Sequence, residues 1–244
     1  MFRIFKRKTM FGPMTEFLRD HINQFQEKQD SIPSDIFDVT MFSLEEILGV
    51  YESMDILMQK KDYSGCIKLA RSILENSINI QYIYKSDPEN RAKNFKLKSM
   101  DGMAKKFKTL SEHTPEVIEM HDFFQEKLKE YTPEKKIREK FKELNLDATY
   151  ARSFVRLSEH IHPTYRSHRL DYTENRPYVE ELKRTVRADT CLITLMALEK
   201  ICTKYDLDGG VMVIDDLGYK GVVFFGTNPR KEEEKSKEYL KGDR

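Results

Sequence analysis

Apolar residues recur at steps of three and four along most of the chain, which is the spacing of one face of an α-helix. The longest such line starts near Tyr63 and ends before Pro88. It comprises Cys66, Ala70, Ile73, Ser77, Ile80 and Tyr84. The pattern predicts a central buried helix, which should stop near Ser86 because the residue before a proline is disfavoured in the helical region.

Start signals divide much of the rest of the chain, up to residue 205, into further amphipathic helices. Pro13 fits the first turn of a helix that ends near Asp30. Ser43 and Glu46 match a capping box, in which each side chain accepts from a backbone amide of the first turn, and they predict a helix from Ser43 to about Lys61. Only ten of the 244 residues are glycine, so few positions interrupt the helical spacing. Together with that spacing, the low glycine content predicts an all-α body. Further helices are expected over 116–130, 134–144, about 147–162 and 178–205.

The pattern changes after residue 206. Residues 211–214 and 222–225 are runs of β-branched and aromatic residues separated by turn-forming residues, and they predict a β-hairpin. An isolated hairpin is marginal in water, so it should pack against the helices or a second subunit. We therefore expect an all-α helical bundle with a small C-terminal β-hairpin. Its three parts are an N-terminal extension with one helix (1–42), a helical domain (43–205), and the hairpin with a charged tail (206–244).

Charge is abundant but balanced, with 42 basic and 41 acidic residues. This balance argues against a protein that coats duplex DNA, although it allows a local basic site. The three cysteines, Cys66, Cys191 and Cys202, lie in apolar helical pattern without a C-x-x-C pair, which favours buried thiols in a reducing compartment. No apolar run reaches the roughly 18 residues of a membrane span. We expect a cytoplasmic protein that does not contact a membrane.

Candidate chemistry is concentrated between residues 152 and 169. Two arginines, a glutamate and two histidines fall on one expected helix that ends at Pro163, and three more basic residues follow in an expected loop. The helical members are Arg152, Arg156, Glu159, His160 and His162. The loop members, which would extend an anion-binding rim, are Arg166, His168 and Arg169.

A wheel at 100° per residue separates this helix into two sides. The apolar stripe consists of Tyr150, Phe154, Leu157 and Ile161. Arg156 and His160 share a face as i,i+4 neighbours, so a site within one chain would use Arg156, Glu159 and His160, with Arg152 behind them. His162 lies about 120° from Arg156, so these two converge only if His162 meets Arg156 of a second copy across a twofold axis. The structural alternative is an exposed ladder of charges with His162 at the helix C-terminus, where an imidazolium is favourable.

The spacing Arg156-x5-His162 resembles the Arg-x(4–6)-His motif of the HEPN superfamily, and the string from Tyr150 to Pro163 is similar to an uncharacterised bacterial branch of HEPN-like proteins. The resemblance includes a preceding helix (70–83) and covers roughly residues 45–205. It implies a compact helical bundle, a homodimer, and the metal-independent ribonuclease activity that many members show in toxin and antiviral systems. It also implies a composite site in which Arg156 and His162 of each subunit surround one scissile phosphate.

The implied chemistry gives each residue a role. Arg156 would bind the phosphate and offset charge in the transition state, and His162 would transfer a proton to or from the ribose 2′-hydroxyl or the leaving oxygen. RNA would be the substrate, and an antitoxin or another defence-system protein would be a further partner. The reaction would need no metal or cofactor. Many active members place a polar residue directly after the arginine, where this chain has Leu157. The alternative is therefore a catalytically inactive helical module that binds a protein or a nucleotide.

Two other features have both a structural and a functional interpretation. Arg71 and Glu75 form an i,i+4 pair on an apolar helix, either as a salt bridge that fixes helix register or as a contact to the Arg156 helix that supports RNA binding. Residues 91–108 carry seven basic side chains and two phenylalanines, which suit either a solvated helix face or a track for an RNA backbone. A metal-dependent hydrolase is disfavoured because no His-x-x-x-His or carboxylate–histidine set recurs on one helix face.

Overall fold

The protein is described by a computed structural model that covers residues 11–110, 115–133, 135–155, 157–158, 176–208, 210–216 and 219–225. Its elements are α1 (Gly12–Glu27), η1 (Gln29–Ser31), α2 (Ser34–Gln59), α3 (Tyr63–Lys85), α4 (Pro88–Leu110), α5 (Pro115–Lys127), η2 (Leu128–Glu130), α6 (Ile137–Glu143), α7 (Asp147–Thr149), η3 (Tyr150–Val155), α10 (Arg176–Tyr205), β1 (Gly210–Asp216) and β2 (Tyr219–Phe225). Helices dominate, which confirms the predicted helical body. No helix in the part of the chain that the structure describes is long and apolar enough to cross a membrane.

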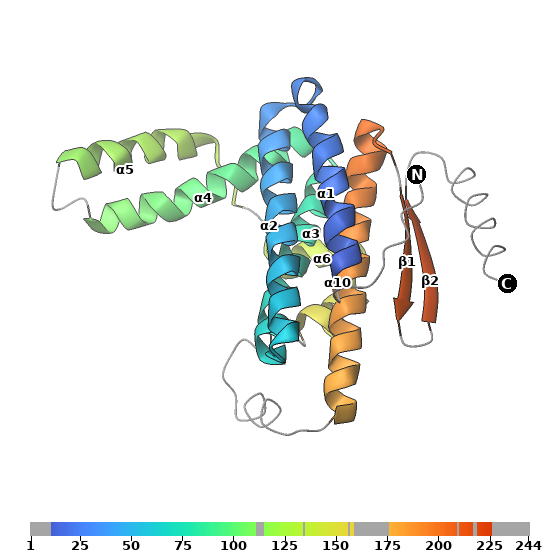
Figure 1. The fold of residues 1–244 in the computed structure, drawn as a ribbon. Helices are drawn as coiled ribbons and strands as arrows, with labels where there is room; N and C mark the ends of the chain where they lie inside the picture. The colour runs from blue at the N-terminus through green and yellow to red at the C-terminus, as the bar shows by residue number, and fades with distance from the viewer. Residues whose placement is uncertain are drawn as a thin grey trace.

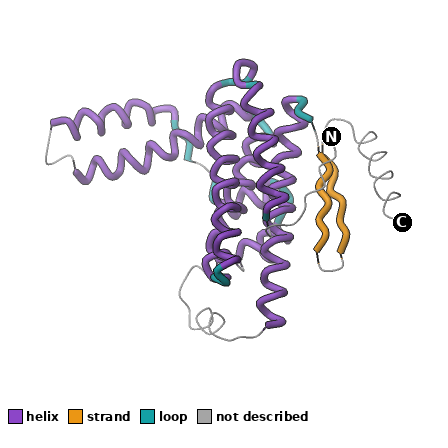
Figure 2. The backbone as a smooth tube through the Cα atoms, viewed as in Figure 1, coloured by secondary structure: helices purple, strands orange, loops and turns teal. Residues whose placement is uncertain are grey.

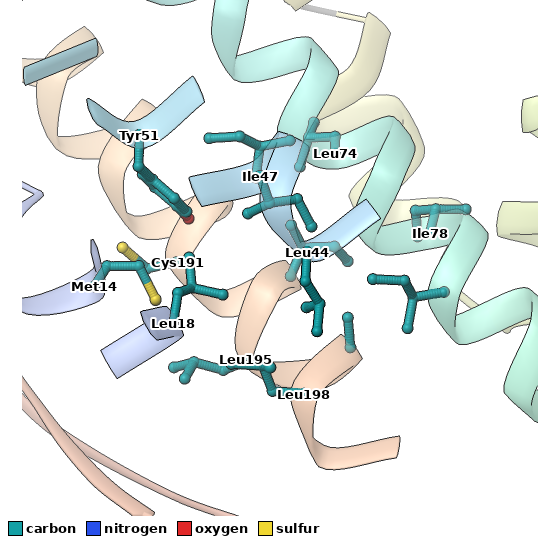
Figure 3. Packing of buried hydrophobic residues seen from close by; sticks show 14 of the residues in the cluster. Met14, Leu18, Leu44, Ile47, Tyr51, Leu74, Ile78, Cys191, Leu195 and Leu198 are labelled. Atoms are coloured by element: carbon teal, nitrogen blue, oxygen red, sulfur yellow. The ribbon is translucent and has the colours of Figure 1, made fainter. Parts of the chain in front are cut away.

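The long helices α1, α2, α3 and α10 lie side by side and enclose the core (Figure 1). Figure 3 shows how α2 and α3 meet α10, with Leu44 and Ile47 of α2 between Leu74 of α3 and Leu195 of α10. These four side chains are at most 1% exposed, so their apolar surface is almost completely removed from water. Burial of this kind stabilises the bundle by about 25 cal/mol per Å² of apolar surface.

Several predicted boundaries agree with the structure. The central helix α3 runs from Tyr63 to Lys85, and the Asp62 carboxylate caps it by accepting a hydrogen bond from the Gly65 amide at 2.8 Å. Pro13 lies in the first turn of α1, and α5 begins at Pro115. Proline is suited to a first turn because the amide it lacks would have no helical partner there.

The predicted helix start at Ser43 is wrong. Helix α2 begins at Ser34, directly after Pro33, and Ser43 lies fully buried in its interior. Ser43 and Glu46 have capping-box spacing, but the apolar pattern already starts at Ile36, and tertiary packing of that stripe extends the helix back to the proline. The boundary expected between residues 42 and 43 therefore falls inside α2, and α1 packs into the same core as α3 and α10.

The predicted buried thiols are confirmed: Cys66, Cys191 and Cys202 are all free and buried. Burial raises the pKa of Cys66 to about 11 and that of Cys202 to about 12. Since the thiolate is the reactive form, neither thiol is suited to nucleophilic chemistry at neutral pH.

Two parts extend from the helical bundle. The distal half of α4 and the whole of α5 form a helical arm, which projects away from the other helices in Figures 1 and 2. Phe124 of α5 is buried in this arm, whereas Met103 and Phe123 are about half exposed. At the other end of the chain, β1 and β2 pair as antiparallel strands, with Val213 opposite Val222, and β2 contacts α10.

Candidate functional site

The segment that carries the candidate site begins as a short helix, α7, and continues as a π-helix, η3, over Tyr150–Val155. A π-helix has more residues per turn than an α-helix, so a wheel drawn at 100° per residue does not apply through η3. Single π-turns inside helices occur frequently at functional sites. The backbone here is thus less regular than the sequence predicts.

The apolar side of this segment is packed on the bundle as predicted. Phe154 and Leu157 are each 4% exposed, and Tyr150 packs against the core. The rings of Tyr150 and Phe154 are stacked at 5.4 Å, and Phe141 of α6 lies 5.3 Å from the first and 5.6 Å from the second. These ring contacts hold the segment against α6. Ile161, the last predicted member of the stripe, is outside the described residues.

Two polar contacts attach the same segment to α3 and α10. The Ser153 hydroxyl donates a hydrogen bond to the Asp189 carboxylate of α10, and both residues are buried. The Arg71 guanidinium of α3 lies over the Phe154 ring, with its Cζ atom 4.8 Å from the ring centre. Arg71 Nε also donates to Glu75 Oε1 at 2.9 Å. The predicted salt bridge is confirmed, and the same arginine contacts the segment that leads to Arg156.

Arg71 is the candidate site residue whose side-chain surroundings are known. The backbone of Arg152 belongs to η3, and its side chain is outside the described part of the chain. The remaining candidates also lie outside the described residues: Arg156, Glu159, His160, His162, Arg166, His168 and Arg169.

The basic stretch 91–108 forms most of α4, and several of its cations are paired with carboxylates. Lys96 contacts Asp35 at 2.7 Å and Asp38 at 2.9 Å, and the hydrogen bonds that it donates to these two carboxylates raise its pKa. Lys105 contacts Asp101 at 2.6 Å. These pairs favour the structural interpretation of the stretch, since a paired cation has less attraction left for an RNA phosphate.

Sequence reasoning missed a group of cations around Tyr82. Arg91 of α4, and Lys135 and Lys140 at α6, place their charged groups 3.9, 5.9 and 5.1 Å from the centre of the Tyr82 ring. The signal in the sequence is the density of basic residues between 135 and 142, but their pattern predicts only an amphipathic helix over 134–144. Among the residues that the structure covers, no three His, Cys, Asp or Glu side chains are arranged to hold a metal ion.

Comparison with known proteins gives one family. The sequence profile described as "Family of unknown function (DUF5677)" matches residues 37–177, which run from within α2 through η3 and include the whole Arg156–His162 segment. Comparison with curated proteins and with solved structures gives no match.

Proposed function

We propose that this chain, which belongs to the DUF5677 family, is a HEPN-like, metal-independent endoribonuclease that acts as a toxin or antiviral-defence effector. In this proposal the helical body is a HEPN-type bundle with a small C-terminal hairpin, and the protein works in the cytoplasm as a homodimer. An antitoxin or another protein of the same defence system would control it. RNA would be its substrate.

One observation carries the proposal: the Arg156-x5-His162 motif directly follows a segment that is fixed on three sides. Phe141 of α6, Arg71 of α3 and Asp189 of α10 contact the residues from Tyr150 to Phe154. A group that acts on a phosphate needs a fixed position, because small displacements of a catalytic side chain reduce the rate strongly. A π-helix just before the motif is consistent with a functional segment.

The proposed chemistry uses the side chains of two subunits. Arg156 binds the scissile phosphate and offsets the charge that builds up in the transition state. His162 transfers a proton at the ribose 2′-hydroxyl or at the leaving oxygen, for which a pKa near neutrality is suitable. Glu159 and His160 are the further catalytic candidates. Arg71, Arg152, Arg166, His168 and Arg169 would contact the RNA or support these contacts.

The test is cleavage of total RNA by purified protein in EDTA, with Arg156→Ala and His162→Ala beside the wild type. We expect the wild type to cleave RNA in the chelator and both variants to lose at least about a hundredfold in rate, which is the usual contribution of a general acid or base. Cleavage that stops when EDTA is added would contradict the metal-independent mechanism. Circular dichroism of the variants controls for folding.

A second candidate function is a catalytically inactive module that binds a protein or a nucleotide. It is favoured by Leu157, which follows Arg156 directly and is 4% exposed, so it is packed in the core where many active HEPN enzymes carry a polar residue. In the same assay, a correctly folded dimer that leaves RNA intact with or without added Mg²⁺ would favour the module over the nuclease.

A further inference from the structure

Cations from α3, from α4 and from the segment before α6 contact Glu143, the last residue of α6. Arg91 of α4 and Lys135, which precedes α6, each bind one oxygen of the Glu143 carboxylate, at 2.7 Å in the case of Arg91. Lys85, the last residue of α3, donates to the Glu143 carbonyl oxygen. The hydrogen bonds from Lys135 and Arg91 lower the pKa of Glu143, so this carboxylate stays ionised and holds both cations in place.

A fourth cation lies beneath these three. Lys140 of α6 is 2% exposed, and its ammonium donates to Asn79 Oδ1 at 2.8 Å. It also lies 5.1 Å from the centre of the Tyr82 ring and 5.9 Å from that of Phe95. Aromatic faces attract a cation, so the two rings and Asn79 hold this ammonium in place.

The exposed side of α6 extends this charge toward solvent. Residues 135–143 contain five basic and two acidic residues, although the whole chain has a formal net charge of only +1. Arg138 and Lys142 are exposed i,i+4 neighbours on one helix face, an arrangement in which like charges repel. Neither pairs with a carboxylate in the described part of the chain. We call the exposed cations Lys85, Arg138 and Lys142 the α6 basic surface.

We propose that the α6 basic surface binds the phosphodiester backbone of single-stranded RNA. Arg138 and Lys142 are about 6 Å apart along the helix axis, and Lys85 reaches the carbonyl oxygen of Glu143 at its C-terminal end, so these exposed cations extend along α6 and do not surround one point. A line of cations suits an extended polyanion better than a single small anion. The inference rests on the proposed function for its choice of RNA.

The position of this surface relative to the candidate site supports RNA as its ligand. Phe141 lies on α6 between Arg138 and Lys142 and contacts both Tyr150 and Phe154 of η3. An RNA strand held on the exposed side of α6 would thus lie one helix away from the segment that carries Arg156. The paired lysines of α4, by contrast, belong partly to the arm that projects from the bundle (Figure 1).

The test is fluorescence anisotropy with a 5′-labelled 2′-O-methyl oligouridylate, which binds as RNA does but lacks the 2′-hydroxyl needed for cleavage. The test variant combines Arg138→Glu and Lys142→Glu, and the matched control combines Lys98→Glu and Lys106→Glu, two exposed lysines of α4. We expect the test variant to raise the Kd at least about tenfold. We also expect a weaker salt dependence: the slope of log binding constant against log salt concentration should become shallower by about 0.7 for each phosphate that the variant no longer neutralises. The control should change the Kd by less than about threefold.

The outcomes separate this inference from the nuclease proposal. Equal weakening by both variants, weakening by the control alone, or no binding by the wild type would overturn the α6 basic surface, whether or not the protein cleaves RNA. Weakening confined to the test variant supports it even when no cleavage is seen. Where charge reversal reduces the helical circular dichroism, the neutral pair Arg138→Gln and Lys142→Gln replaces it, with Lys98→Gln and Lys106→Gln as control.

Discussion

At the scale of single residues, His21 shows how burial determines protonation. The imidazole lies in α1 and is 4% exposed, with its ring centre 4.3 Å from that of Phe17. Its Nδ1 atom is 2.8 Å from the Phe17 carbonyl oxygen, so the neutral ring donates a hydrogen bond from this nitrogen. Burial lowers the pKa of His21 from its ordinary value of 6.5, because a charged imidazolium loses more hydration than a neutral ring does.

This lowered pKa makes the stability of the fold depend on pH. Below pH 6.5 the unfolded chain binds a proton at residue 21 before the folded chain does, so acid favours unfolding until the folded pKa is also passed. We expect the free energy of unfolding to decrease from pH 7 to pH 5 and to decrease less steeply in His21→Gln, whose amide can still donate to the Phe17 carbonyl. Urea unfolding at pH 7, 6 and 5 measures both slopes. If the free energy of unfolding changed equally with pH in the wild type and in His21→Gln, His21 would not contribute to the pH dependence of stability.

At the scale of elements, the contact between Arg71 of α3 and Phe154 of η3 joins the central helix to the candidate site. The Arg71 side chain is 27% exposed and its Cζ atom lies 4.8 Å from the ring centre, a geometry for which a cation–π contact is worth about 0.5–1 kcal/mol. A double-mutant cycle with Arg71→Met and Phe154→Leu should give a coupling of this size in the free energy of unfolding. The same cycle with Glu75→Gln in place of Arg71→Met is the control. If both cycles give equal coupling, the effect does not come from the stacked guanidinium.

The helices could be predicted where the signal is local and strong. Pro88 ends α3 and Pro115 begins α5 through constraints on a few neighbouring residues, so both boundaries follow from the sequence. Ser43 was misinterpreted because capping-box spacing also occurs inside a helix, and only packing decides between the two.

The candidate site was predictable only in part. The burial of Phe154 and Leu157 follows from helical spacing, and so does the pairing of Arg71 with Glu75. The stacking of Arg71 on Phe154 does not, because these residues are 83 positions apart and come together through the packing of η3 on α3. The cations around Tyr82 do not follow from the sequence for the same reason, because residue 91 and residues 135–140 meet at Tyr82 only through the packing of α4 and α6 on α3.

At the scale of the whole molecule, the proposed function depends on a second copy of the chain. In the proposed dimer, Arg156 of one subunit acts with His162 of its partner, whereas within one regular helix the two side chains would point about 120° apart. Complementation between inactive subunits distinguishes these arrangements. A dimer of one Arg156→Ala chain and one His162→Ala chain has one intact pair if the pair forms between subunits, and none if it forms within a subunit.

We therefore expect RNA cleavage to return when the two inactive variants are coexpressed with different affinity tags and purified through both tags. Each mixed dimer keeps one of two pairs, so it should show up to about half of the wild-type rate, and a random mixture, in which half of the dimers are mixed, up to about a quarter. The double variant Arg156→Ala/His162→Ala, paired with wild type, is the control, because it leaves no intact pair between subunits. Activity in this control but not in the mixed dimer would place the pair within one chain.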